Sequence, residues 1–351
     1  MDEKLRRKPD EELNWQEHIR KRPGMYLGQV NHKGFADKLK VLITQICEKT
    51  LSNLVQITFK EQNIGTLKFK NLQNSLREDI SIINKDYNHN RIELPILNAL
   101  SSKMRISFIG DDKINYTFNY GDTFNKVRNQ EIEANELEID FELDRIIWGS
   151  EFKWNSNYLS YELREFCYLN PKVKFEISDE TGQESNTNTY QFKNGLSDRL
   201  EIEILNAIGS CYFKHSINLK NEKFEFQAAL AFRQYSVDQN FIRTYVNNEI
   251  TPENGTHLDA LLKGLTYGVM KYFQSENLVD EYRISEKGMK EGLVCMINIK
   301  IENAIYSGCV KNKLANSEII EPIAKHVSEE LFNSILGDNE STQKLIDKFK
   351  I

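Results

Sequence analysis

The chain has 351 residues and a formal net charge of −6, with 40% hydrophobic and 28% charged residues. Its length suffices for two domains of ordinary size, each with its own core. Its acidic balance excludes a global basic field that would attract nucleic acid, so any DNA contact is expected to be weak and local. No apolar run is long enough to span a bilayer, and the charged start at 1–10 is not a signal peptide. We therefore expect a cytoplasmic protein with no membrane partner.

The cysteines are spread along the chain and show no CxxC spacing. This pattern favours reduced thiols over a zinc site or a redox pair. Most of them lie in apolar runs and are expected to behave as small hydrophobic residues. They are Cys47, Cys167, Cys211, Cys295 and Cys309.

The chain begins with a predicted charged arm and a basic turn. Residues 1–18 are rich in charged side chains, and residues 19–28 read IRKRPGMYLG, in which Pro-Gly indicates a turn. Residues 34–50 then place apolar side chains on one helical face, which predicts an amphipathic helix packed on a core. These apolar residues are Phe35, Leu39, Leu42, Ile43 and Ile46.

Alternating apolar residues predict a sheet after this helix. Period-2 patterns at 55–69 and 104–120, each interrupted by turn residues, indicate two hairpins. Residues 137–143 alternate apolar and acidic side chains, which predicts a strand with one buried face and one acidic, solvated face. We assign no acid–base chemistry to these carboxylates, because they lie on a regular strand without a second catalytic partner.

The first domain is expected to close with a helix at 158–170, stopped by Pro171, and a strand at 173–177. Residues 178–189 are polar and rich in turn formers. A domain boundary is therefore placed near Asn194.

The second domain contains a strand, a tight turn and a helix start in residues 243–259, RTYVNNEITPENGTHLD. Asn and Gly in the turn tolerate positive φ, whereas Pro252 fixes φ. Thr256 is expected to cap the helix. The helix then carries an apolar stripe with a 3.6-residue period, which must be buried. The residues of this stripe are Leu258, Leu261, Leu262, Leu265 and Val269.

Three further elements are predicted in the second domain. Alternation at 224–232 and an apolar run at 291–300 indicate strands. Residues 320–331 form an amphipathic pattern that predicts a helix ending at Gly337.

Two of these segments resemble a known family. RKRPGMYLG at 20–28 is similar to the segment that opens the ATPase domain of gyrase B and topoisomerase IV B subunits, which are type IIA topoisomerases. YVNNEITPENGTHLDALLKGL at 245–265 is similar to the transducer-domain signature of the same subunits, with Asn254-Gly255 where the family has Gly-Gly. The resemblance covers almost the whole chain. It implies an α+β or α/β two-layer sandwich of the gyrase, Hsp90, histidine kinase and MutL (GHKL) ATPase type, followed by a ribosomal S5-like transducer domain. The implied parts are an N-terminal arm at 1–18, a GHKL ATPase-like domain at 19–194 and a transducer domain at 195–351.

The resemblance places the family's nucleotide chemistry on the helix at 34–50, but the expected side chains are missing. Functional relatives carry there a Glu that activates the attacking water and, one turn later, an Asn that holds magnesium. The matching positions are Val41 and Gln45. We therefore expect no catalytic residue and no metal ligand at these positions.

Both phosphate loops of the family are also replaced. The family's adenine-binding Asp and first Gly-x-Gly correspond to KNLQNS at 70–75, which has neither Asp nor Gly. The second glycine-rich loop corresponds to NHNRIELP at 88–95, whereas the Asn-Ala-Leu-Ser that follows at 98–101 is intact. The loss removes backbone N–H groups that would surround the phosphates.

One candidate for cofactor binding remains. In relatives a Gln-x-Lys loop extends its Lys to the γ-phosphate, and Cys309-Val310-Lys311 here keeps the Lys and loses the Gln. A lone Lys in a Lys-rich loop is usually a surface residue, so Lys311 is a weak candidate. No cofactor is expected, and ATP with magnesium would bind only under the alternative function below.

Two functions follow from the resemblance. The favoured one is a catalytically degenerate gyrase B-like protein that acts as a nucleotide-independent binding or dimerisation module, because lost loops cannot offset the desolvation of phosphates. Its partner would be a second copy, gyrase or topoisomerase subunits, or, weakly, DNA. The alternative is an ATP-binding subunit of a type II DNA topoisomerase that retains nucleotide binding or hydrolysis. A structural protein without a topoisomerase link is a third option. The sequence ends before the family's cleavage domain, so we expect no DNA cleavage.

Overall fold

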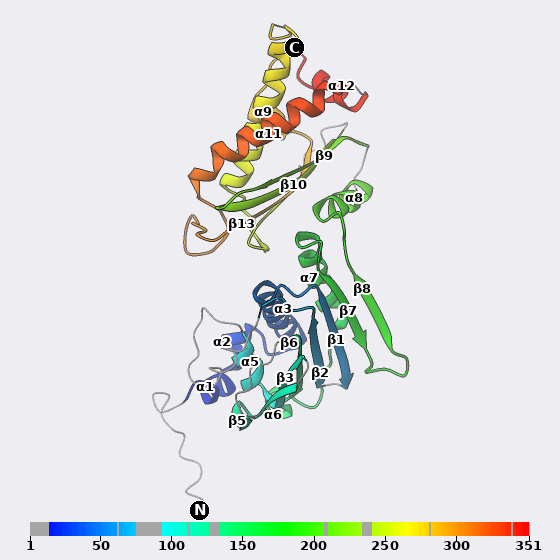
Figure 1. Cartoon of the computed structure of the whole chain (residues 1–351), viewed down its shortest axis with the longest axis vertical. Helices are drawn as coiled ribbons and strands as arrows, with labels where there is room; N and C mark the ends of the chain where they lie inside the picture. The colour runs from blue at the N-terminus through cyan, green and yellow to red at the C-terminus, as the bar shows by residue number, and fades with distance from the viewer. Residues whose placement is uncertain are drawn as a thin grey trace, which may run out of the picture. The chain divides into compact units, whose positions relative to one another are not determined.

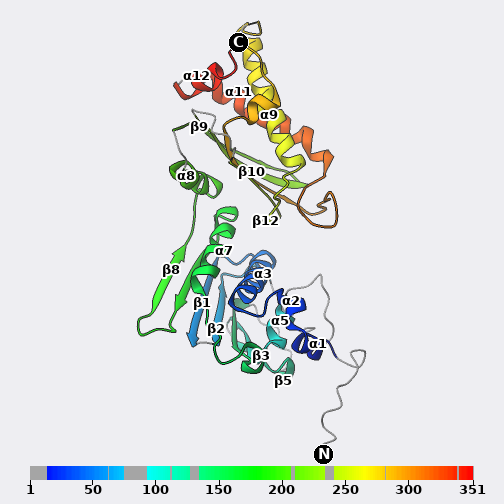
Figure 2. The same cartoon turned by 180° about the vertical axis from the view of Figure 1, so that it is seen from behind.

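The computed structural model describes residues 14–61, 63–74, 93–110, 113–126, 134–206, 210–233, 241–280, 282–337 and 340–350. The chain divides into two compact units, residues 1–192 and 193–351. Each unit has its own hydrophobic core. The helices and strands of both units are labelled in Figure 1, and Figure 2 shows them from behind. None of the helices that the structure describes is long and apolar enough to cross a membrane.

The first unit is built on an eight-stranded sheet with the order β5-β4-β3-β6-β2-β1-β7-β8. All neighbouring strands are antiparallel except β1 and β7, which run parallel. The two predicted hairpins are β1–β2 and β3–β4. The strands are β1 (Leu54–Glu61), β2 (Ile64–Lys70), β3 (Ser101–Gly110), β4 (Lys113–Asn119), β5 (Asp122–Lys126), β6 (Ala134–Leu143), β7 (Lys174–Asp179) and β8 (Asn186–Tyr190).

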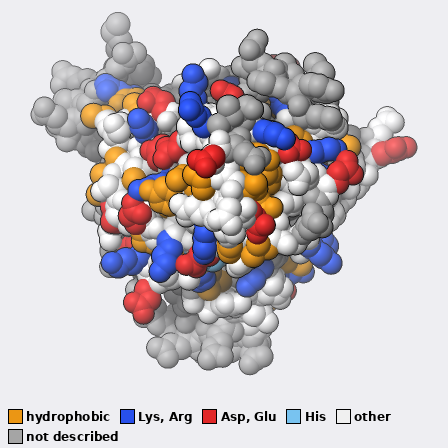
Figure 3. Space-filling view, turned by 90° about the horizontal axis from the view of Figure 1, so that it is seen from above, with side chains coloured by type: hydrophobic (Ala, Val, Ile, Leu, Met, Phe, Trp, Pro, Cys, Tyr) orange, Lys and Arg blue, Asp and Glu red, His pale blue; other side chains and the backbone are white. Residues whose placement is uncertain are grey.

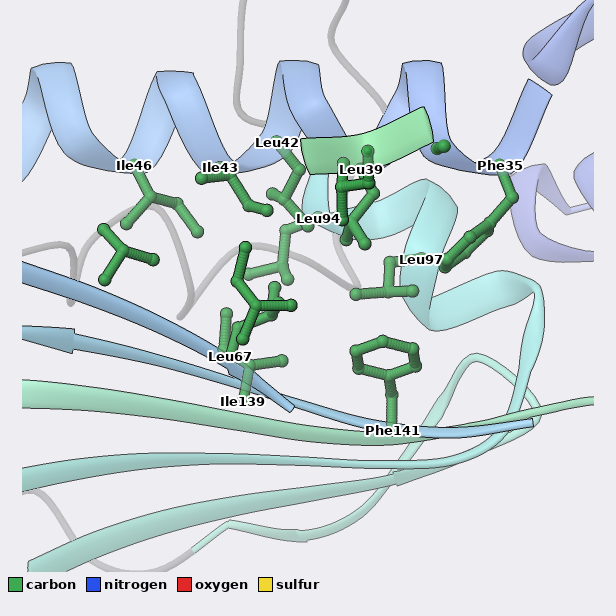
Figure 4. Close-up of a cluster of buried hydrophobic side chains, with 14 of the residues drawn as sticks. Phe35, Leu39, Leu42, Ile43, Ile46, Leu67, Leu94, Leu97, Ile139 and Phe141 are labelled. Atoms are coloured by element: carbon green, nitrogen blue, oxygen red, sulfur yellow. The ribbon is translucent and has the colours of Figure 1, made fainter. Parts of the chain in front are cut away.

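Helices cover one face of this sheet and form a two-layer arrangement. The longest, α3, presents its apolar stripe to the sheet, and the short helix α5 lies against the same core (Figure 4). Asn31 starts α3 because its Oδ1 accepts hydrogen bonds from the backbone N–H groups of Lys33 and Gly34. The helices are α1 (Trp15–Lys21), α2 (Pro23–Leu27), α3 (His32–Thr50), α5 (Leu94–Ala99), α6 (Arg145–Trp148) and α7 (Ser156–Leu169).

The other face of the sheet carries charged side chains. The acidic residues of β6 were expected to be merely solvated, but each lies opposite a cation on β2 or β3. Such exposed pairs individually contribute little to stability, and here they neutralise the acidic row. The pairs are Glu136–Lys70 (4.0 Å), Glu138–Lys68 (2.8 Å), Asp140–Arg105 (2.5 Å) and Glu142–Lys103 (3.5 Å).

The second unit is a five-stranded sheet with the order β12-β11-β13-β10-β9. Eight of the nine residues of β13 are buried, so both faces of this central strand are covered. Helices α9 and α11 pack on one face, and α8 contacts β10 and β13. The strands are β9 (Cys211–Lys220), β10 (Phe224–Arg233), β11 (Phe241–Val246), β12 (Glu249–Ile250) and β13 (Leu293–Ile301). The helices are α8 (Leu196–Asn206), α9 (Thr256–Ser275), α10 (Glu286–Lys290), α11 (Ile320–Leu336) and α12 (Glu340–Asp347).

The predicted helices and strands are confirmed, but two local predictions were wrong and one strand was not predicted. The basic turn is two short helices, because Asn14 Oδ1 caps α1 through Glu17 N (2.8 Å) and Pro23 occupies the first turn of α2. Part of the polar stretch 178–189 belongs to strand β8. Thr256 is the first residue of α9 and not its cap, which is Gly255. Residues 15–18 of the expected arm lie in α1, and residues 1–13 lie outside the described residues.

Candidate functional site

Helix α3 places Val41 and Gln45 one turn apart, as their spacing predicts. Both side chains are half-buried. The Gln45 side-chain oxygen accepts a hydrogen bond from the backbone N–H of Glu93 at 2.8 Å. Glu93 is the residue that precedes α5. The Gln45 side chain therefore ties α3 to the start of α5.

Lys38 adds an ion pair to this contact. Its Nζ lies 3.4 Å from Glu93 Oε1. Lys38 and Glu93 also line an apolar cavity of about 10 Å³ between α3 and α5, with space for roughly one water. The other lining residues are Leu27, Phe35, Leu39, Leu42, Ile96, Leu97 and Leu100. The contact between α3 and α5 is therefore mainly hydrophobic, as the side chains in Figure 4 show.

Sequence reasoning identified Val41 and Gln45 but missed Lys38 and Glu93. Lys38 lies seven residues before Gln45 and so shares its face of the helix. Glu93 precedes Leu-Pro, a pattern typical of a helix start. These two signals mark Lys38 and Glu93 as candidates, but the contact between them arises from tertiary packing.

Two residues of the segment 70–75, which the resemblance aligned with the family's first glycine loop, cap the end of α3. The backbone N–H groups of Gln73 and Asn74 donate to Thr50 O at 2.8 and 3.2 Å. The Asn74 side-chain amide donates to Lys49 O at 3.1 Å. Helix ends leave such carbonyl groups without partners, so this segment has a structural role. Residues 75–92, which include most of the expected second loop, lie outside the described residues.

The RKRPGMYLG segment joins α1 to α5 and α6. Arg20 forms an ion pair with Asp144, whose side chain is 5% exposed, and donates to Ala99 O at 2.8 Å. The Arg20 guanidinium also lies 5.2 Å from the centre of the Tyr120 ring. Asp144 Oδ1 accepts from Ile146 N at 2.9 Å and starts α6. The retained motif therefore holds the scaffold together.

In the second unit, the turn before α9 and the loop that carries Lys311 are joined by backbone hydrogen bonds. Leu314 N donates to Asn254 O at 3.0 Å, and Thr256 N donates to Leu314 O at 3.1 Å. Asn254 has φ = 61°, a conformation that Asn tolerates, which explains how it replaces the family's first Gly. Gly255 has φ = 136°, and a Cβ there would lie 2.3 Å from Leu314 O. Only glycine fits this position.

Lys311 itself is exposed in this loop. Its Nζ lies 5.9 Å from the centre of the Tyr306 ring. Lys311 lies in the second unit, whereas Val41 and Gln45 lie in the first. Within the described residues, no group of His, Cys, Asp and Glu is arranged to hold a metal ion.

A buried histidine lies under the same turn. His257 has no exposed surface, and its Nε2 lies 3.5 Å from Thr251 Oγ1. Thr251 Oγ1 is in turn 2.8 Å from Thr244 Oγ1. Burial lowers the pKa of His257 to about 4, because the charged ring would lose its solvation. His257 is therefore a neutral core residue that connects α9 to the turn.

These features define the class of the protein: a GHKL-type ATPase fold in the first unit, continued by a second α+β unit. The fold matches the crystal structure of the 43K ATPase domain of Thermus thermophilus gyrase B with a TM-score of 0.79 and 19% identity, covering 95% of this chain and 93% of that one. It also matches the topoisomerase IV ATP-binding domain of Francisella tularensis with a TM-score of 0.73 and 19% identity, covering 95% of each chain.

Sequence comparison leads to the same family. Residues 185–351 match the family model described as DNA gyrase B. The chain is 22% identical to the DNA gyrase B protein of Staphylococcus epidermidis, over 94% of this chain and 55% of that protein. It is 24% identical to the type 2 topoisomerase B protein of Aquifex aeolicus, over 94% and 45%. The chain thus spans about half the length of these relatives, and over 94% of its own length it is similar to type IIA topoisomerase B subunits.

Proposed function

We propose that the chain is a catalytically degenerate gyrase B-like protein that acts as a nucleotide-independent binding or dimerisation module. The observation that carries the proposal is the hydrogen bond from Glu93 N to the Gln45 side-chain oxygen, 2.8 Å long. The resemblance assigns Gln45 to the family's magnesium position, and its side-chain oxygen already accepts a hydrogen bond from the protein's own backbone. The neighbouring base position is Val41, whose side chain has no group that accepts a proton.

The charges and backbone groups around α3 support the same proposal. Lys38 pairs with the carboxylate of Glu93, 3.4 Å away, and so is not free to pair with a phosphate. The backbone N–H groups of Gln73 and Asn74, near the family's first glycine loop, donate to Thr50 O. Without such donors, a buried triphosphate would lose its solvation with no compensating hydrogen bonds. Lys311 alone supplies one cation on an exposed loop.

Association with another protein is the activity that such a scaffold retains. Two of the relatives are named as subunits, which favours a protein partner. A second copy or the gyrase and topoisomerase subunits of the same cytoplasm are the proposed partners, through the N-terminal arm and the ATPase-like unit. On the face seen in Figure 3, cations and carboxylates are interspersed. This mixture and the net charge of −6 favour weak DNA binding at most.

Nucleotide should not regulate this association. A ligand shifts a conformational equilibrium only by its difference in affinity for the two states, and no nucleotide affinity is expected here. In this proposal the second unit, residues 193–351, is the transducer domain without its nucleotide signal.

Light scattering of the purified chain, with and without magnesium-ATP, tests the proposal. We expect an oligomer whose mass does not change with ATP. A truncation that removes residues 1–13 but keeps Asn14, the cap of α1, tests the role of the arm without disturbing the helix. In a matched variant the same residues are replaced by a Gly/Ser segment of equal length. This variant shows whether the association depends on the sequence of the arm or only on its length. A monomer in every mixture, including mixtures with gyrase subunits, would refute the proposal.

A further inference from the structure

We infer that strand β8 is a self-complementary edge on which a second copy of this chain pairs in antiparallel fashion. The inference rests on the proposed function, because it names the surface and the partner for the association. β8 is the last strand of the eight-stranded sheet, and in both views of the molecule it lies at the sheet's border (Figure 1; Figure 2). An edge strand presents backbone N–H and C=O groups that have no ladder partner.

The two described sheets end in the strands β5, β8, β9 and β12. Of these edge strands, β8 is the one without a feature that hinders pairing with another strand. Proteins usually protect an edge strand with charged residues, proline, a bulge or short length. At the opposite edge, the register between β4 and β5 shifts next to Thr117. Strand β9 has a register shift and carries Lys214 and Lys220. Strand β12 is only two residues long. β8 reads Asn-Thr-Asn-Thr-Tyr and pairs with β7 over its whole length without a shift.

Side-chain contacts at both ends also fix the conformation of β8. Thr187 Oγ1 lies 2.8 Å from Ser178 Oγ on β7. At the other end, the Cys167 thiol donates to Tyr190 O at 3.8 Å, and the Arg164 guanidinium lies 5.8 Å from the centre of the Tyr190 ring. Because the strand is already ordered, pairing on it requires little additional loss of conformational entropy.

The sequence of β8 favours a second copy over an unrelated peptide. An antiparallel pair with its two-fold axis at Asn188 sets Asn188 against the same residue of the other copy. By the same symmetry, Thr187 of each copy lies opposite Thr189 of the other copy, which gives two Thr–Thr pairs. Cross-strand Thr–Thr pairs are favourable, and no like charges oppose each other because the strand has none. A two-fold axis repeats every contact, which is the usual geometry of homodimers.

The pairing is tested first by cross-linking with Asn188→Cys. Directly opposed residues of antiparallel strands have Cβ atoms about 4.5–5.5 Å apart, close enough for a disulfide after a small adjustment. We expect Asn188→Cys to form a disulfide-linked dimer under mild oxidation. The matched control is Gln183→Cys, which is exposed on the β7–β8 turn and does not oppose its own copy. The unsubstituted chain gives the background of the native cysteines, of which Cys309 is exposed.

A second pair of variants uses charge. Thr187→Lys with Thr189→Lys places like charges against each other in both halves of the pair, and we expect the mass in light scattering to fall by half. Thr181→Lys with Gln183→Lys adds the same charge on the turn and should leave the dimer intact. The β8 inference is wrong if Thr187→Lys with Thr189→Lys is still a dimer and Asn188→Cys forms no cross-link. In that case the proposed association remains valid, but it uses another surface. A monomer for every form overturns both, and binding of an unrelated extended peptide on β8 overturns the self-pairing.

Discussion

The side chain of Gln45 is the smallest part of the molecule on which the proposed loss of nucleotide chemistry depends. Substitution Gln45→Ala removes the acceptor for Glu93 N and leaves a part-buried N–H group without its hydrogen bond. We expect the first unit to lose about 1–3 kcal/mol of unfolding free energy. All three tryptophans, Trp15, Trp148 and Trp154, lie in this unit, so urea unfolding followed by tryptophan fluorescence reports on it alone.

Val41→Ala is the matched control for this measurement. Val41 is half-buried on the same helix, one turn earlier, and its side chain makes no hydrogen bond. Its truncation removes apolar contacts only. An equal or smaller loss for Gln45→Ala than for Val41→Ala would show that the contact with Glu93 contributes nothing beyond packing.

His257 gives a prediction about pH. Its pKa is about 4 in the folded protein and 6.5 in the unfolded chain, so the unfolded chain binds the extra proton between these values. The contribution of His257 to the free energy of unfolding should therefore fall by up to about 3 kcal/mol as the pH is lowered from about 6.5 to 4. Below pH 4 this contribution should not change further. Urea midpoints from far-UV circular dichroism at pH 7.5 and 5 measure the effect. His257→Gln should flatten this dependence, whereas His326→Gln, at a partly exposed position on α11, should not. An unchanged slope in His257→Gln would contradict the assignment.

At the scale of elements, the turn before α9 and the Lys311 loop behave as one structure. Gly255→Ala places a Cβ 2.3 Å from Leu314 O at φ = 136°, so the two segments must separate. We expect a loss of more than about 3 kcal/mol in the second unit. Gly308→Ala is a close control, because Gly308 lies in the same loop with φ = 103° and its Cβ would meet nothing within 4 Å. Thermal unfolding by circular dichroism should separate the two variants, and equal effects would refute the coupling.

The elements that the sequence predicted are those with a clear period. Helix α3 and strands β1 to β4 show apolar repeats that one packed face requires. β8 was missed because Asn-Thr-Asn-Thr-Tyr has no apolar alternation, and its pairing with β7 decides its conformation. The helices around Pro23 were missed because Pro-Gly is typical of turns, while Pro also fits the first turn of a helix.

The candidate site was predictable only in part. The resemblance located Val41 and Gln45, and the structure places them on one helix as expected. It did not reveal the partner of Gln45, because Glu93 lies 48 residues away in sequence and only tertiary packing brings it to α3. For the same reason, the capping of Thr50 by Gln73 and Asn74 does not follow from local pattern.

At the scale of the whole molecule, two units with separate cores have the fold of a gyrase B ATPase domain, and we propose that its nucleotide residues have been replaced. The replacements have structural partners within the first unit, as Gln45 and Asn74 show. The two segments that carry the family resemblance also make structural contacts, as Arg20 in the first unit and Gly255 in the second show. This division is the reason for the proposal that association was retained and nucleotide control was lost.

Titration calorimetry of the full chain with magnesium and a non-hydrolysable ATP analogue tests this account most directly. We expect no binding heat beyond dilution for the unsubstituted chain. We expect none for Gln45→Asn either, which restores the family's residue type without the glycine loops. Binding tighter than roughly 100 μM, equivalent to about 5.5 kcal/mol, would contradict it. That result would make Lys311 a candidate nucleotide sensor again and favour an ATP-binding topoisomerase subunit.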